Sequence, residues 1–151
     1  PQIGPGKAAR FEAHNSDEGR IRVTGKSQDA FAFRTPSLRN VSLTAPYGHS
    51  GAFTTLEGVV QHHMSPEQSL NEYDTTEAIL PNLDGAEDWN IQQNAQERAA
   101  LIAAVDVSSI SLTPDEVADI VAFLRALTDE DAAAGRLGVP ESVPSGLRVD
   151  R

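Results

Sequence analysis

The segment from Thr113 to Leu127 constrains the fold most, because it carries every local signal of an amphipathic helix. Thr113 can cap the helix, Pro114 suits its first turn, and Glu116 stands where a capping box needs it. One apolar stripe follows at helical spacing, made by Val117, Ile120, Val121, Leu124 and Leu127. A helix with a single apolar stripe has to bury that stripe against another element, so this segment predicts a helical core.

Two further segments show the same period. One spans residues 54–64, with Thr54 or Thr55 as its cap, and the other runs from about residue 94 to residue 105. Their stripes consist of Leu56, Val59, Val60 and position 63 in the first, and of Leu101, Ile102 and Val105 in the second. We therefore expect a mainly α chain with three principal helices.

The rest of the chain reads as loops. Residues 1–53 are rich in Gly, Pro, Arg and Thr, with short extended pieces expected at 21–23 and 30–33. Residues 65–93 read as a loop with no more than a short turn, and the tail from Gly135 as an extended strap. The 151 residues suit one domain, with a loop-rich part (1–53), a helical part (54–128) and an extended tail (129–151).

Composition excludes several classes of protein. The sequence has 22 acidic and 12 basic residues. Its net charge of −10 argues against nucleic acid or an anionic membrane as the main partner. No apolar run approaches the ~18 residues of a membrane span. The chain has no cysteine, so it contains no disulfide, no thiolate metal site and no Cys-x-x-Cys-His haem attachment motif.

Adjacent histidines end the helix expected at 54–64. At roughly 100° per residue, position 63 falls about 20° from Leu56, so we expect His63 to point with the apolar face. His62 is expected at the edge or in solvent, and Met64 on the flank of the stripe. Two interpretations stay open: a core histidine satisfied by a backbone carbonyl, or an axial haem ligand, which has to be a neutral imidazole.

The stretch FRTPSLRNVSLTAPYGHSGAFTTLEGVV, from Phe33 to Val60, resembles a segment of the bacterial di-haem cytochrome c peroxidase family, which includes the MauG-like enzymes. The resemblance continues through LTPDE at 112–116 and IVAFLRALT at 120–128, which look like that family's last helix. It implies a cytochrome c-like haem domain fragment, wrapped by long ordered loops, from the C-terminal part of a longer chain.

The resemblance also implies roles for individual residues. The position eight residues after Thr55 matches the distal axial ligand of one haem iron, which makes His63 that ligand and the iron bis-histidine. Haem would then cover the stripe of the helix at 54–64. Thr44 and Pro46 match positions whose backbone carbonyls bind calcium, and Arg39 and His49 match residues near the haem propionates.

The functional expectations concern a longer protein. The haem attachment motifs and the catalytic residues would lie upstream, so the segment alone would be inactive while serving the electron-relay haem c. The resemblance implies a periplasmic peroxidase or MauG-like oxidoreductase. Its partners would be the upstream part of the same polypeptide and either a protein substrate or an electron donor such as a small cytochrome or a cupredoxin. It also leaves room for a homodimer.

Two alternatives remain from other classes. One is a non-haem metal protein that uses His14, His49, His62 or His63 with carboxylates, although their spacing fits no zinc or facial-triad pattern. The other is a haem-free structural or interaction domain. Visible absorbance and intact mass of the native protein separate these alternatives from a haem enzyme.

Overall fold

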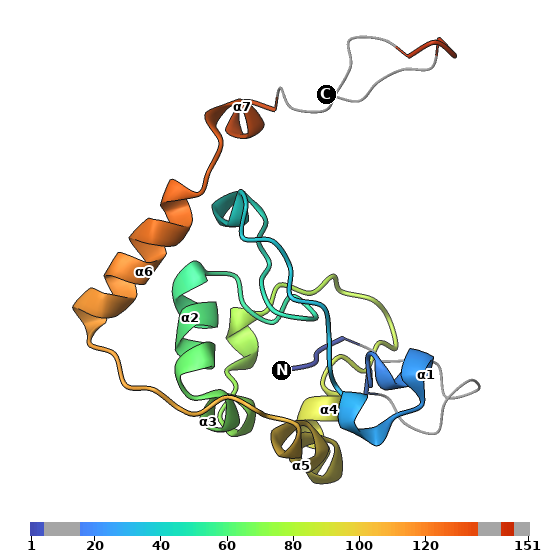
Figure 1. Ribbon diagram of the computed structural model, residues 1–151. Helices are drawn as coiled ribbons and strands as arrows, with labels where there is room; N and C mark the ends of the chain where they lie inside the picture. Colours follow the sequence, from blue (N-terminus) through green and yellow to red (C-terminus); the bar gives the residue numbers. More distant parts are fainter. Residues whose placement is uncertain (5–15, 136–142, 147–151) are drawn as a thin grey trace.

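The computed structural model describes residues 1–4, 16–135 and 143–146 (Figure 1). Helices make up 45% of the described residues, and β-pairing among them is limited to isolated bridges between Gly19 and Ala32 and between Tyr47 and Phe53. This confirms a mainly α chain with long loops, as expected of a cytochrome c-like fragment. Most of the tail expected after Gly135 lies outside the described residues.

The three principal helices form where the sequence predicts them. They are α2 (Leu56–Met64), α5 (Ala95–Ala103) and α6 (Pro114–Ala126). Thr55 caps α2 by accepting the Gly58 N–H, and Asn94 caps α5 through Gln96 and Glu97. At α6 the complete capping box is present, because Thr113 and Glu116 each accept a hydrogen bond from the other's backbone N–H.

Short helices fill segments that were expected to be irregular. They are α1 (Ile21–Thr24), α3 (Pro66–Asn71), α4 (Asn90–Gln93) and α7 (Glu130–Ala133), with single 3₁₀ turns at Ser27–Asp29, Val41–Leu43 and Thr75–Glu77. The extended piece expected at 21–23 is therefore wrong: Gly25 takes a left-handed conformation and donates its N–H to Ile21, which closes a helical turn. In the extended piece expected at 30–33, only Ala32 takes part in β-pairing, through an isolated bridge to Gly19.

The expected loop at 65–93 is also wrong in part. Ser65 ends α2, and Pro66 takes the first position of α3, where its missing N–H costs nothing. The chain therefore enters a second helix at once instead of leaving α2 as a loop. Pro66 and Leu70 are buried, so α3 is part of the packed structure.

Helices α2 and α6 lie side by side and build the core (Figure 1). They run antiparallel. Arg125 at the end of α6 pairs with Glu57 at the start of α2 (3.1 Å), whereas the backbone N–H of Ile110, in the segment before α6, donates to the Met64 carbonyl at the end of α2. The buried cluster consists of Ile3, Tyr47, Ala52, Phe53, Leu56, Val121 and Leu124. Leu56 is only 5% exposed and Val59 and Val60 pack against the cluster, so α6 covers much of the stripe that was assigned to haem.

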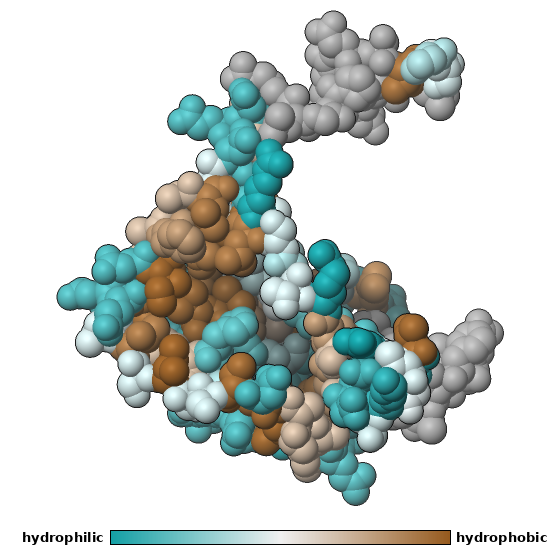
Figure 2. All heavy atoms as spheres, in the orientation of Figure 1, coloured by the Kyte–Doolittle hydropathy of each residue, from teal (hydrophilic) through white to brown (hydrophobic). Residues whose placement is uncertain are grey.

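Hydrophobic side chains also remain at the surface. Figure 2 shows them gathered over the region of α2 and α6. The exposed large ones include Leu38, Leu43 and Phe123, the last of them 60% exposed. Within the described part of the chain, no helix has the length and apolar composition that crossing a bilayer requires.

Candidate functional site

His63 presents a free ring nitrogen at the surface of α2. Its Nδ1 lies 2.7 Å from the carbonyl oxygen of Val59, one turn earlier in the same helix. Because a carbonyl can only accept, Nδ1 is the donor of this hydrogen bond, and Nε2 is the nitrogen left available to a ligand. The side chain is exposed. A backbone carbonyl that fixes the tautomer and orientation of the ring is the usual support of a metal-ligating histidine.

His62 is held in a different way. Its Nδ1 lies 2.9 Å from the Ser69 hydroxyl of α3, and its ring centroid lies 5.1 Å from that of Phe53. Burial, together with nearby positive charge, lowers the pKa of His62 to about 3. The imidazole is therefore neutral at physiological pH and serves as part of the packing between α2 and α3.

The expected exposure of the two histidines is reversed in the structure. His62 is half-buried and His63 is exposed, although the helix begins where the sequence predicts. The reason is α3, which follows α2 immediately and covers the side of the helix that carries His62. Among the described residues nothing buries His63, so its face of the last turn is open to a ligand.

Arg39 already has a partner. Its Nη2 lies 3.3 Å from a carboxylate oxygen of Asp129, just beyond α6. This carboxylate also caps α7, and its pKa is lowered first by the backbone N–H of Ala132 and further by Arg39. Both side chains are exposed enough to rearrange, so a second carboxylate could share the guanidinium fork.

His49 lies in a small cluster with two residues from the loop-rich part. Its Nε2 is 3.1 Å from a carboxylate oxygen of Asp17, and its ring centroid lies 3.7 Å from that of Phe33, with the ring planes tilted by 31°. Asp17 is fixed in turn, since its other oxygen accepts the Gly19 N–H. No sequence signal marked Asp17 or Phe33 as partners, because contacts across 32 and 16 positions in irregular chain follow no period.

Thr44 and Pro46 lie in an exposed loop before α2, on either side of Ala45, which joins Pro46 through a cis peptide bond. Among the described residues, neither of their carbonyl oxygens accepts a hydrogen bond. Both are therefore open to a hard cation, which prefers oxygen ligands. Calcium takes roughly six to eight such ligands, so further oxygens have to come from water or other groups.

The donor chemistry fits haem at His63, whose imidazole is oriented by the Val59 carbonyl and keeps Nε2 without a hydrogen-bond partner among the described residues. No hydrogen bond, ion pair or ring contact within the described ranges joins His63, Arg39 and His49 to one another. The described residues also hold no group of three or more histidines and acidic residues that could bind a metal ion. The non-haem alternative therefore finds no support there, and His14 lies outside the described residues.

Comparison with known proteins gives several relatives, although no family model and no solved structure matches the chain. The chain is 36% identical to the cytochrome-c peroxidase IdrP1 of Pseudomonas sp. (strain SCT) over 68% of its own length and 24% of the relative. To the cytochrome c551 peroxidase of Pseudomonas aeruginosa it is 34% identical, over 76% of the chain and 21% of that protein.

The methylamine utilization protein MauG of Paracoccus denitrificans is 32% identical over 82% of the chain and 30% of the relative. The chain thus spans only about a quarter of the length of the curated relatives that it matches. The matches to the two cytochrome c peroxidases and to MauG each cover most of the chain. The chain therefore belongs to the bacterial di-haem cytochrome c peroxidase and MauG-like family, as a C-terminal part of such a protein.

Proposed function

We propose that the chain supplies the distal side and the axial ligand of the electron-relay haem in a periplasmic di-haem cytochrome c peroxidase or MauG-like oxidoreductase. Peroxide reduction is the expected activity of the whole protein, because the relatives named as peroxidases outnumber MauG among its matches. The catalytic residues would belong to the upstream part, and this segment alone would be inactive.

The observation that carries the proposal is the state of His63. Its Nε2 has no partner among the described residues, its Nδ1 is held by the Val59 carbonyl, and its side chain is exposed on a helix fixed to the core. Haem c, when bound, supplies one-electron redox chemistry. A second imidazole from the upstream attachment motif would make the site bis-histidine, which lowers the reduction potential relative to a site with methionine.

Arg39, His49, Thr44 and Pro46 would support this site without contacting iron. Arg39 would offer its guanidinium to a haem propionate, sharing it with Asp129, and His49 would line the same pocket. The carbonyls of Thr44 and Pro46 would bind calcium and hold the loop that leads into α2. The cofactors of the site are thus haem c and calcium.

The partners follow from the same proposal. The upstream part of the polypeptide would carry the haem attachment motifs, and a small cytochrome, a cupredoxin or a protein substrate would exchange electrons with the enzyme. The net charge of −10 favours a donor with a positive surface, because opposite charge speeds the encounter. A homodimer is the remaining partner to test.

Turnover by the full-length protein tests this function. We expect the purified protein to show a Soret band and to oxidise a reduced small cytochrome when hydrogen peroxide is added. A strong chelator should lower the rate and change the haem spectrum, and added calcium should restore both. A colourless protein would favour the haem-free structural domain instead. Unchanged activity after chelation would remove calcium from the proposal.

A further inference from the structure

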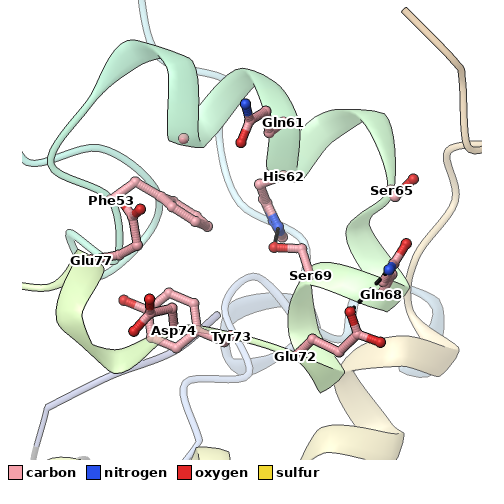
Figure 3. Close-up of a pocket in the computed structure, with 11 residues that line it drawn as sticks. Phe53, Gln61, His62, Ser65, Gln68, Ser69, Glu72, Tyr73, Asp74 and Glu77 are labelled. Atoms are coloured by element: carbon pink, nitrogen blue, oxygen red, sulfur yellow. Dashed lines mark hydrogen bonds between the residues drawn. The ribbon is translucent and has the colours of Figure 1, made fainter.

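A second site lies beside His62. A cavity of about 260 Å³ opens between α2, α3 and residues 72–77 (Figure 3). Much of its wall comes from residues 65–77, for which the proposed function has no role. The cavity and its lining are observed independently of haem, so a ligand site there does not depend on the proposed function.

Three carboxylates line the cavity, from Glu72, Asp74 and Glu77, and no lysine or arginine does. Within the described residues none of the three forms an ion pair. Glu72 accepts a hydrogen bond from the Gln68 amide (2.9 Å), and Asp74 accepts two from Thr76. The hydrogen bonds from Thr76 lower the pKa of Asp74, so this carboxyl is ionised at neutral pH. The cavity thus repels anions.

Two aromatic rings form a corner of the same cavity. Phe53 and Tyr73 lie with ring centroids 5.8 Å apart and planes at 89°. The Tyr73 hydroxyl donates to the Ala52 carbonyl, which fixes its ring. Burial first, and then the charges of Glu77 and Asp74, raise the pKa of Tyr73 to about 12. The negative potential of the acids therefore extends over an aromatic wall.

Gly58 provides the space for this arrangement. It lies in the first turn of α2, where glycine costs about 1 kcal/mol relative to alanine. A Cβ at this position would lie 3.2 Å from a carboxylate oxygen of Glu77 and 3.4 Å from the Phe53 ring. The absence of a side chain therefore lets Glu77 and Phe53 approach the helix from one side.

We propose that this cavity binds an organic cation, the ammonium or guanidinium group of a free amine or of a partner protein's lysine or arginine. Carboxylates satisfy the N–H donors of such a group, and aromatic rings attract its charge and cover its carbon atoms. A bare metal ion fits less well, because the acids do not form a metal-binding group. The wall at His62 places the bound cation next to the helix turn that carries His63.

A ligand-observed NMR titration of the full-length protein tests the site. The probes are methylammonium, guanidinium and a lysine blocked at both ends, with sodium at equal ionic strength as the reference. We expect saturable binding of the organic cations. A blocked lysine that binds more tightly than methylammonium points to a partner side chain, and the reverse order points to a free amine. The absence of saturable binding by all three probes would overturn the proposal.

Variants locate the binding. Glu77→Gln removes one charge with little change in shape and should weaken binding about tenfold, the loss expected for one charge-assisted hydrogen bond. Gly58→Ala should weaken it by narrowing the cavity. Glu67→Gln makes the same charge change on α3 outside the cavity lining and should leave the affinity within about twofold. An equal loss in Glu67→Gln and Glu77→Gln would show only diffuse attraction to an acidic surface and would overturn the site.

Discussion

Asn40 shows how one residue can fix the loop that carries much of the family resemblance. Its backbone N–H donates to the Leu127 carbonyl at 3.1 Å, and its side-chain oxygen accepts the Asp129 N–H at 2.7 Å. Its φ of 57° lies in the left-handed region, which asparagine tolerates better than most residues. Asn40 thus ties the loop to the end of α6, and this position brings Arg39 to Asp129.

Two substitutions of Asn40 separate the contribution of its left-handed backbone conformation from that of its side-chain hydrogen bond. Asn40→Ala should lower the free energy of unfolding by about 1–3 kcal/mol, because it strains the backbone and leaves the Asp129 N–H without its acceptor. Asn40→Gly loses the acceptor but keeps the conformation easily, so its loss should be smaller. Urea denaturation of the full-length protein, followed at the haem absorbance, measures both. A glycine variant as unstable as the alanine variant would show that the backbone conformation contributes nothing.

Helix α6 depends on an acidic cap, which makes its start sensitive to pH. Glu116 accepts the Thr113 N–H at 2.7 Å and the Thr113 hydroxyl at 2.9 Å, and these bonds lower its pKa below the ordinary 4.5. A folded-state pKa below the unfolded value means that the stabilisation is present above the unfolded pKa. It is lost as the pH falls through the lower, folded value.

Glu116→Gln should therefore destabilise the protein more at about pH 7 than at about pH 3, where the wild-type carboxyl is increasingly protonated. Urea denaturation at the two pH values measures the difference. Asp115→Asn makes the same charge change in the same turn, without removing the cap bonds, and controls for the helix dipole. An equal penalty at both pH values would contradict the role of the charged cap.

The elements that the sequence predicted are those with signals inside the element. The capping box and stripe of α6 lie within a dozen or so residues of each other. The cap of α2 and the cap of α5 likewise lie directly beside the helix that each one begins. Helices α1 and α7 have four residues and α3 has six, which is too short for a hydrophobic period to appear. These helices depend on local caps and on packing, so sequence patterns did not reveal them.

At the scale of the whole molecule, helical phase predicted His63 on the apolar stripe of α2, but it could not say which turns of that helix other elements cover. The stripe of α2 is packed on α6 near Leu56, whereas the last turn is open, and α3 instead buries His62. The partners of Arg39 and His49 could not be predicted from the sequence for the same reason. Asp129 lies 90 positions from Arg39 and Asp17 lies 32 from His49, and no local pattern links such positions.

The function proposed for this chain depends on His63, and not His62, as the ligand of the haem iron. The decisive measurement is the visible and electron paramagnetic resonance spectrum of His63→Ala in the full-length holoprotein, with His62→Ala as the matched control. We expect His63→Ala to give a high-spin iron that binds added ligands, and His62→Ala to keep the low-spin, six-coordinate spectrum. A low-spin, six-coordinate spectrum retained in His63→Ala, or a high-spin form in His62→Ala, would contradict this assignment.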